Sequence, residues 1–432
     1  MPIRDIIVLA FFAISLPVCF LRPFYGLLLW TVVAFLNPQS LTWGPAQSIP
    51  LAMAVAVPTL IGFFFFCRNW RGVVSREFLL IVLLWVWFTI TSFVSTNTPM
   101  FMHHAQDTWF RWEFVSKILV MTAFTMAIVD RFSRLRVLVL AIAGCFGIFV
   151  LKTLPFVLIT GGADRLYGPS NSMIADNNDF ALALNMTLPL FFFLAQTEAS
   201  RWLRRIFGFL FVITIPAVLF TYSRGGVIGL VAVLGLMLFR LKRRLILIPV
   251  IALGLGASLM LTPASWRQRM DPTQSLDASA RERLNAWTFS ARLAMDYPIF
   301  GGGFDTFTPE MFVRYAPDSS DVHGPHSVYM GVLAEHGFIG LLLYLALVVS
   351  CFASTHHLVK LGRLDGASRV VSYANMFRFS LVGFLTSGLF LGRAYFDYFF
   401  TIVACIVILK QVCQFESARP GFAELTEEEV AA

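Results

Sequence analysis

The sequence predicts an all-α, polytopic membrane protein, and its composition gives three reasons for this fold class. Of the 432 residues, 58% are hydrophobic and only 13% are charged, whereas a soluble chain carries about 25% charged residues. Phenylalanine alone fills 45 positions, and the mean hydropathy is +0.75. So little charge cannot cover a water-exposed surface, so the composition excludes a cytosolic globular protein, a secreted enzyme and a disordered chain.

Apolar runs recur along the whole chain, and they set the expected number of membrane spans. A helix that crosses a bilayer needs about 20 apolar residues. The first run is not followed by an Ala-x-Ala-like site, which favours a retained span over a cleaved signal peptide. Only Leu21-Arg22-Pro23 joins the first two runs and the second is short, so we expect about twelve spans, with thirteen as the alternative. The runs lie at residues 5–21, 24–37, 49–67, 78–95, 114–129, 136–159, 179–196, 206–221, 226–239, 245–262, 327–354, 376–391 and 395–412.

The runs divide the chain into four regions. Residues 1–262 contain predicted transmembrane helices 1 to 10, and residues 263–326 form one large polar loop. Residues 327–412 contain the C-terminal transmembrane helices, and residues 413–432 form a polar tail.

Clusters of basic residues mark alternate connections between the runs. By the positive-inside rule these connections and the tail lie in the cytoplasm, so the 263–326 loop lies on the opposite side of the membrane. The net charge of +8 is thereby attributed to topology rather than to nucleic-acid binding. The clusters are Arg68, Arg71 and Arg76; Arg131, Arg134 and Arg136; Arg201, Arg204 and Arg205; Arg240, Lys242, Arg243 and Arg244; and Lys360, Arg363, Arg369 and Arg378.

The 263–326 loop carries six Arg and eight Asp or Glu, a net charge of −2, so its arginines do not mark topology. A helical pattern over Ala280–Met295 ends at Asp296-Tyr297-Pro298. After the flexible turn Gly301-Gly302-Gly303, a second short helix is expected at Thr306–Tyr315. The loop is too small for a domain with its own full core. We therefore expect it to lie folded on the membrane face, over the cavity that the spans enclose.

The sequence carries no metal-binding or nucleotide-binding signature. The six cysteines lie in or beside apolar runs without metal-ligand spacing, so we interpret them as packing residues. His103-His104 precede Asp107, but adjacent histidines usually point apart. No metal and no cofactor are therefore predicted. The cysteines are Cys19, Cys67, Cys145, Cys351, Cys405 and Cys413.

Arg224 lies on the wrong side of the membrane for a topology-determining arginine. In Tyr222-Ser223-Arg224-Gly225-Gly226 it separates two apolar runs on the non-cytoplasmic side. A cation at the membrane edge is costly unless it meets an anion or water, and the two glycines allow close approach of backbone or ligand. The pattern indicates either an anion-binding arginine or a turn arginine that reaches lipid phosphates.

Two arginines share the predicted loop helix in Ala280-Arg281-Glu282-Arg283-Leu284-Asn285-Ala286-Trp287. Arg283 and Trp287 are four residues apart and share one helix face, whereas Arg281 and Glu282 point elsewhere. By itself this pattern favours a solvated helix with an Arg–Trp stack.

His326 precedes the eleventh run in His323-Gly324-Pro325-His326-Ser327-Val328-Tyr329. Ser327 is a plausible helix N-cap, which places His326 at the mouth of the span with an imidazole that can accept a proton near neutral pH. Glu335 follows about 13 Å further along the helix, too far for a catalytic pair with His326, so we interpret it as a structural hydrogen-bonding group. Asp179 in the cap of the seventh span is a further candidate near the site.

Taken together, these motifs resemble the bacterial O-antigen ligase/polymerase superfamily (WaaL- and Wzy-like). Four motifs occur in order: Ser-Arg-Gly-Gly, Arg-x-x-x-Trp, Asp-Tyr-Pro-Ile-Phe-Gly-Gly-Gly-Phe, and His-Ser-x-Tyr-x-x-x-Leu-Ala-Glu-x-Gly-x-x-Gly. The N-terminal stretches Leu21-Arg22-Pro23-Phe24-Tyr25-Gly26 and Leu36-Asn37-Pro38-Gln39-Ser40-Leu41-Thr42-Trp43-Gly44 resemble the O-glycosylation ligase branch. This favours a ligase over a polymerase.

The resemblance implies a GT-C-like glycosyltransferase in the inner membrane of Gram-negative bacteria, with its active site and large loop facing the periplasm. It implies an inverting, metal-independent transfer of a glycan from undecaprenyl diphosphate to a sugar hydroxyl of lipid A–core. Carried over by motif, His326 is the general base and Arg224 and Arg283 hold the diphosphate, with Arg281 as the alternative to Arg283. Supporting roles are open to Ser223, Trp287, His323, Glu335 and Asp179.

These residue types suit such chemistry. A departing diphosphate gains negative charge, and the planar arginine fork binds phosphate oxygens bidentately. A sugar hydroxyl is a poor nucleophile, so a general base contributes a factor of about 10²–10⁴. Two nearby arginines are expected to lower the pKa of His326 and keep its imidazole neutral.

Three alternatives stay open. A Wzy-like polymerase uses another undecaprenyl-linked glycan as acceptor, and a protein O-glycosylation ligase uses a protein hydroxyl. A transporter or flippase moves the lipid-linked glycan without making a bond, although the sequence shows no convincing internal repeat of the kind common in transporters.

Overall fold

The computed structural model describes residues 3–42, 44–66, 73–240 and 272–416, together with short stretches between 248 and 266. In these residues every regular element is a helix, and seven helices are long and apolar enough to cross a membrane. This confirms the predicted all-α, polytopic membrane fold, whereas the number of about twelve spans stays a prediction. The seven helices are α1 (Ile3–Leu21), α4 (Arg76–Thr96), α6 (Phe132–Thr160), α7 (Asn177–Thr197), α8 (Arg201–Phe220), α14 (Val328–Leu364) and α16 (Asp397–Glu416).

The other described helices are shorter, less apolar or part of the polar loop. Most of the predicted span 245–262, Cys67 and the tail from residue 417 onwards lie outside the described residues. The helices are α2 (Pro23–Leu36), α3 (Leu51–Phe66), α5 (Ala105–Ile128), α9 (Arg224–Arg240), α12 (Pro272–Asp296), α13 (Pro309–Tyr315) and α15 (Ser368–Ser387), with 3-10 turns η1 (Pro38–Leu41), η2 (Pro45–Ser48) and η3 (Met102–His104).

Several helices extend beyond the apolar runs that predict them. α5 begins at Ala105 rather than near residue 114, and α14 continues to Leu364 rather than ending near residue 354. The adjacent pair His356-His357 is therefore part of α14, and both side chains are exposed. Hydropathy marks only the apolar part of a helix, so polar turns at its ends escape a search for apolar runs.

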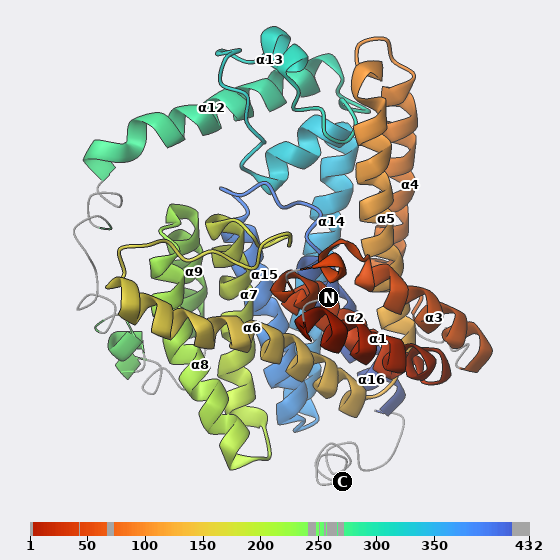
Figure 1. The fold of residues 1–432 in the computed structure, drawn as a ribbon, viewed down its shortest axis with the longest axis vertical. Helices are drawn as coiled ribbons and strands as arrows, with labels where there is room; N and C mark the ends of the chain where they lie inside the picture. The colour runs from red at the N-terminus through yellow and green to blue at the C-terminus, as the bar shows by residue number, and fades with distance from the viewer. Residues whose placement is uncertain are drawn as a thin grey trace.

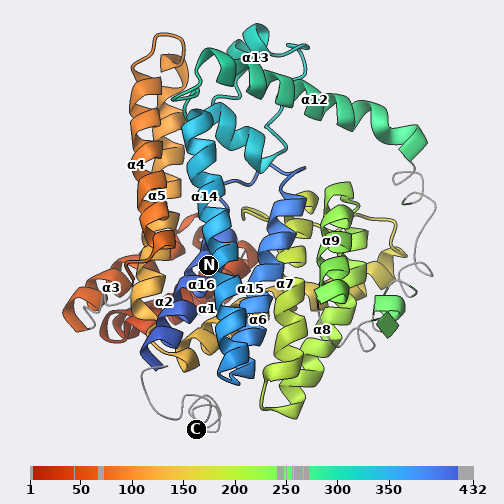
Figure 2. The same cartoon turned by 180° about the vertical axis from the view of Figure 1, so that it is seen from behind.

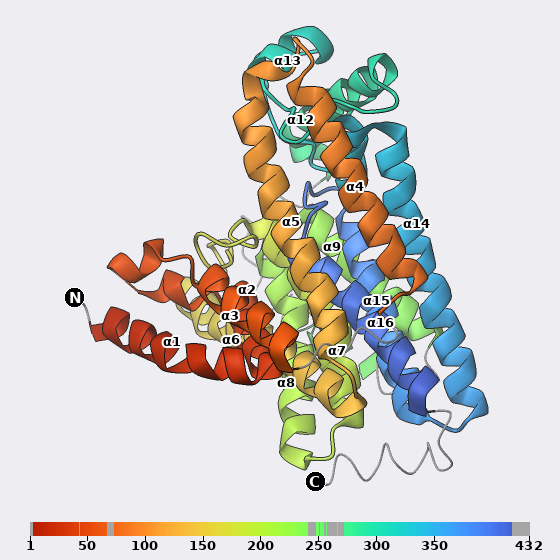
Figure 3. The same ribbon diagram turned by 90° about the vertical axis from the view of Figure 1, so that its right-hand side faces the viewer.

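Two helices, α7 and α16, occupy the centre of the bundle and are largely covered by their neighbours. α7 packs against α8, α9 and α15, and α15 packs in turn against α14 and α16. Figures 1 and 2 show α12 and α13 lying above one end of this bundle, on the side to which α4 and α5 extend. In Figure 3, α1, α2 and α3 project to one side of the remaining helices.

The polar loop contains both predicted helices. The first runs over Pro272–Asp296 and ends at the predicted place, and the second begins at Pro309 because the Thr308 hydroxyl accepts a hydrogen bond from the backbone N–H of Met311. Phe289, Leu293, Met311, Phe312 and Tyr315 form a small apolar cluster with Phe101 of the α4–α5 connection and Ala334 of α14. The loop is thereby folded against the ends of the transmembrane helices.

Glu77 forms a buried polar joint near the start of α4. Its side chain is fully buried and accepts hydrogen bonds from the hydroxyls of Ser350 (2.5 Å) and Ser354 (2.8 Å) on α14. Lys410 Nζ of α16 lies 3.2 Å from Glu77 Oε2, so the carboxylate also forms an ion pair. The joint ties together three helices that are far apart in the sequence.

We expect Glu77→Ala to lower the free energy of unfolding by about 3–5 kcal/mol, because it leaves Lys410 without its carboxylate in a mostly buried place. Thermal unfolding of the purified protein in detergent measures the effect. Lys117→Ala is the control, because Lys117 and Glu113 form an exposed pair worth at most about 1 kcal/mol. Equal losses in both variants would contradict a special role for this joint.

Candidate active site

The turn before α9 fixes the position of Arg224. Ser223 is buried, and its hydroxyl accepts a hydrogen bond from the N–H of Gly226 at 3.0 Å, so it acts as a cap of this helix. Tyr222 adopts a left-handed conformation (φ 58°) and donates its hydroxyl to the carbonyl of Gly162 at 2.6 Å. Arg224 is the first residue of α9 and is half-buried.

The two glycines after Arg224 serve close packing of α9. A Cβ atom at Gly226 would lie 2.6 Å from Cβ of Ala181 on α7, so only glycine fits at this helix contact. A Cβ atom at Gly225 would lie 3.0 Å from Cβ of Phe390, in the segment between α15 and α16. The predicted close approach is therefore made by protein groups on both sides of the helix start.

Arg283 and Arg281 occupy different faces of α12. Arg281 is exposed, whereas Arg283 is half-buried and its Nε has no hydrogen-bond partner among the described residues. The guanidinium carbon of Arg283 lies 5.9 Å from the ring centre of Phe390. Trp287 does not provide the expected stack and instead donates its indole N–H to the carbonyl of Pro325 at 3.1 Å. The geometry thus favours Arg283 over Arg281 as the residue that faces the site.

His326 lies in a strained and well-fixed backbone position. Its φ of 43° falls in the left-handed region that non-glycine residues rarely adopt. The predicted cap at Ser327 is confirmed, since its hydroxyl accepts from the N–H of Met330. On the other side lies Gly392, where a Cβ atom would be in ordinary van der Waals contact, at 3.5 Å, with the backbone nitrogen of His326. A strained conformation held from several sides is typical of a functional position.

The charges of the site act on one another. Burial, then the neighbouring Arg283 and His323, lower the pKa of His326, with Glu282 and Asp176 opposing them. Burial, then the neighbouring Arg224, lower the pKa of Arg283. Arg283 therefore lies within electrostatic reach of both His326 and Arg224, which come from other segments of the chain, and burial together with Arg283 favours the neutral imidazole.

His323 is a neighbour of His326 rather than a member of this group of charged side chains. Its Nε2 lies 2.7 Å from Asp321 Oδ1, and its ring centre lies 6.1 Å from that of His326. The half-buried Asp321 carboxylate already engages this histidine, so His323 acts on His326 mainly as a nearby charge.

Glu335 is part of a structural joint. Its carboxylate accepts a hydrogen bond from the hydroxyl of Tyr395 at 2.5 Å and from the backbone N–H of Asp305 at 3.1 Å. The backbone N–H groups of Gly302 and Gly303 donate to the carbonyls of Ala334 and Glu335 at 2.8 and 2.9 Å. This agrees with the structural interpretation of Glu335.

Glycine is required on both sides of that joint. Gly301 has φ 64°, and a Cβ atom there would lie 2.6 Å from the carbonyl oxygen of Ala334. Gly337 has φ 67° and interrupts α14 with a kink, where a Cβ atom would lie 2.3 Å from the carbonyl oxygen of Ile299. The glycine turn and the Leu-Ala-Glu-x-Gly motif are thus two halves of one contact.

Residues between α15 and α16 complete the site, and they were not predicted. Phe390 lies beside Arg283, Gly392 beside His326, and Arg393 Nη2 lies 2.6 Å from Oδ2 of the buried Asp179. A signal was present, because Arg393 is a lone arginine in a connection that the positive-inside rule predicts to be non-cytoplasmic, as Arg224 is. Among the described residues, no three His, Cys, Asp or Glu side chains are placed to hold a metal ion.

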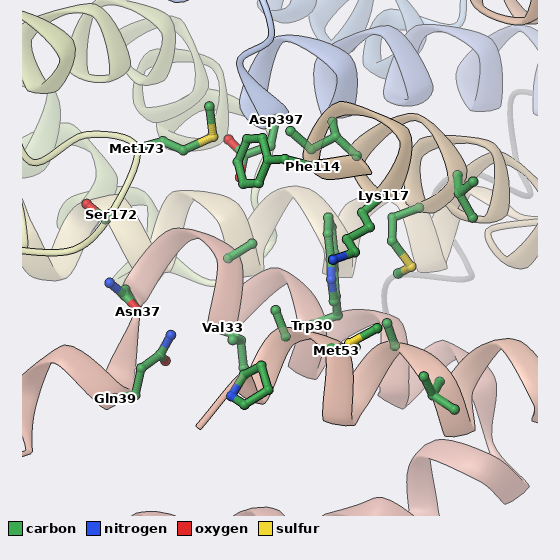
Figure 4. A pocket seen from close by; sticks show the side chains of 18 of the residues that line it. Trp30, Val33, Asn37, Gln39, Met53, Phe114, Lys117, Ser172, Met173 and Asp397 are labelled. Carbon is green, nitrogen blue, oxygen red and sulfur yellow. The ribbon is translucent and has the colours of Figure 1, made fainter. Parts of the chain in front are cut away.

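A cavity of about 440 Å³ lies elsewhere, between α2, α3, α5 and the loop at residues 171–173. Figure 4 shows Trp30, Val33, Met53 and Phe114 among its mainly apolar side chains, with Asp397 and Lys117 as its charged ones. None of Arg224, Arg283 and His326 lines it.

We expect the imidazole of His326 to be neutral at pH 7, with a pKa below about 6.5. Because the charge of Arg283 disfavours the protonated ring, Arg283→Gln should raise this pKa. A pH titration of isotope-labelled histidine by NMR measures both values, with the exposed His357 as internal reference. An unchanged or lower pKa in Arg283→Gln would refute the coupling.

Comparison with known protein families places these residues in context. Residues 209–345 match the family model described as O-Antigen ligase, and this segment contains Arg224, Arg283, His326 and Glu335. Residues 3–199 match a second family model, described as a family of unknown function, DUF5935. No curated protein matches the chain. The match at residues 209–345 supports membership of the chain in the WaaL/Wzy O-antigen ligase superfamily.

Proposed function

We propose that this protein is an O-antigen ligase, which transfers a glycan from undecaprenyl diphosphate to a sugar hydroxyl of lipid A–core. The observation that carries the proposal is the electrostatic proximity of Arg283 to both His326 and Arg224 within the O-antigen ligase domain. These residues come from three segments separated by long stretches of sequence, and the charge of Arg224 lowers the pKa of Arg283. An anionic ligand would relieve their repulsion.

In the proposed reaction, the neutral imidazole of His326 accepts the proton of the acceptor hydroxyl. The hydroxyl oxygen forms a bond to the anomeric carbon while the bond from that carbon to the diphosphate oxygen breaks, which inverts the anomeric configuration. Arg224 and Arg283 stabilise the charge that develops on the departing diphosphate. The imidazolium then releases its proton to water.

We place the site at the periplasmic face of the inner membrane. The connection between α7 and α8 lies at the end of the bundle opposite α12 (Figure 1), and the first turns of α8 that follow it carry Arg201, Arg204 and Arg205. Because basic connections stay in the cytoplasm, this arrangement supports a site open to the opposite compartment, where lipid-linked glycans and lipid A–core would meet.

Substitution of the three residues should separate their roles. We expect His326→Ala to lower the transfer rate by a factor of about 10²–10⁴ in folded, inserted protein. Arg224→Ala and Arg283→Ala should each lower it by about 10²–10³ by weakening stabilisation of the leaving group. The measurement is the gel shift of lipid A–core after incubation with undecaprenyl-diphosphate glycan.

Two neighbours serve as matched controls for these variants. His323→Ala removes a histidine of the same loop, and Arg281→Ala removes an exposed arginine of the same helix, so both should have milder effects. Full activity of His326→Ala would remove this residue from the mechanism. A larger loss in Arg281→Ala than in Arg283→Ala would show that the motif is matched to the wrong arginine.

The acceptor decides among the related activities. One donor is offered to purified protein in detergent with lipid A–core, with a second lipid-linked glycan or with an acceptor protein, and a product is expected with lipid A–core. Product with the second glycan would indicate a polymerase, and product with protein a protein O-glycosylation ligase. Detergent abolishes any transbilayer gradient, so a covalent product also excludes a transporter that makes no bond.

A further inference from the structure

We propose that Arg393 is a third phosphate-binding residue of the site and that Asp179 positions it. The inference rests on the proposed function in one respect, namely that the ligand is the diphosphate of the lipid-linked donor. It adds a residue from outside the matched O-antigen ligase domain, which ends at residue 345.

The segment that carries Arg393 touches each part of the site. Phe390 lies against the start of α9, beside Gly225, and its ring centre lies 5.9 Å from the guanidinium carbon of Arg283. Gly392 lies against the backbone nitrogen of His326. Arg393 is the next residue, so its guanidinium begins from a backbone that is already in contact with the catalytic candidate.

Asp179 holds one edge of the Arg393 guanidinium. Arg393 Nη2 lies 2.6 Å from Asp179 Oδ2, and the side chains are 31% and 9% exposed, respectively. The carboxylate is thus buried while the arginine stays partly open. Fixing a long side chain in this way reduces the entropy that it would lose on binding a ligand.

A second arginine–carboxylate pair, at the opposite end of α7, has a different geometry. There Arg136 donates through both Nε (3.1 Å) and Nη2 (2.5 Å) to the two oxygens of Glu198, which is a closed, bidentate pair. Arg393 contacts one oxygen of Asp179 through one nitrogen, which leaves most of its donors for another anion. A single contact to a buried carboxylate orients the guanidinium group and leaves its other N–H donors available.

The phosphate could belong to the donor or to a phosphorylated acceptor lipid. We assign it to the donor because Phe390 and Gly392, which closely precede Arg393 in the chain, lie beside Arg283 and His326, where the leaving group must lie in the proposed reaction. The two sources are distinguished by measuring the binding of the donor lipid and of the acceptor lipid in separate experiments.

The test is binding of undecaprenyl diphosphate without a glycan to the purified full-length protein in detergent, by calorimetry. We expect Arg393→Ala to weaken binding about tenfold to a hundredfold, because a charge-assisted hydrogen bond is lost. Arg393→Lys keeps the charge but not the fork and should give an intermediate affinity. Arg136→Ala breaks the bidentate pair with Glu198 at the other end of α7. It should lower thermal stability and leave binding of undecaprenyl diphosphate unchanged.

Asp179→Asn tests the positioning role. It keeps an oxygen that accepts a hydrogen bond but removes the charge, so we expect weaker binding than in the unchanged protein and stronger binding than in Arg393→Ala. In a transfer assay, both variants should raise the KM for the donor more than they change the KM for the acceptor.

The outcomes separate this inference from the proposed function. If Arg283→Ala weakens undecaprenyl diphosphate binding but Arg393→Ala and Arg393→Lys do not, the inference is wrong and the proposed function stands. If Arg393→Ala weakens the binding of lipid A but not the binding of undecaprenyl diphosphate, the assignment to the donor is wrong. If Arg393→Ala weakens diphosphate binding while no glycan is transferred to any acceptor, the inference stands and the proposed function fails.

Discussion

The backbone hydrogen bonds from Gly302 and Gly303 to the carbonyls of Ala334 and Glu335 are the interaction on which the candidate active site depends. They join the polar loop to α14 just before Gly337 kinks that helix. α12 ends shortly before this glycine turn, and His326 lies shortly before α14 begins. One contact therefore limits the position of both the arginine helix and the histidine, and it turns a long connection into a fixed cover over the bundle.

The electrostatics of the site follow from that cover. Arg283 is brought close enough to Arg224 for their charges to repel, in a half-buried place beside the ring of Phe390. Such repulsion destabilises the empty protein and favours an anion that neutralises it. Burial, followed by the charge of the same Arg283, lowers the pKa of His326. Arg283 thus links the electrostatics of the second arginine to those of the histidine.

The sequence could predict those features that break a local rule. Composition and apolar runs predict the all-α membrane fold because bilayer thickness acts on each helix separately. Arg224 stands out as a cation on the side poor in basic residues, and His326 as an imidazole directly before a helix cap. Glu335 is interpreted as structural because its spacing along the helix excludes a pair with His326, and its hydrogen bonds to Tyr395 and Asp305 agree with that interpretation.

Other features arise only when distant segments meet. Phe390 and Gly392 look like ordinary residues of a short connection, and their roles come from contacts with α9, α12 and His326. Trp287 shares a helix face with Arg283, yet the indole finds a carbonyl acceptor in Pro325, which helical periodicity cannot foresee. The polar ends of α5 and α14 were missed because hydropathy does not report on helix outside the apolar layer.

The placement of Phe390 and Gly392 also bears on how much of the chain sequence comparison recognises as one unit. Both lie beyond residue 345, where similarity to the O-antigen ligase family ends, yet Phe390 packs beside Arg283 and Gly392 lies near His326 of that segment. The segment that sequence comparison recognises is therefore smaller than the structural unit that surrounds its candidate residues. Exchange of the recognised segment between relatives would carry its reactive groups away from the surfaces that shape them.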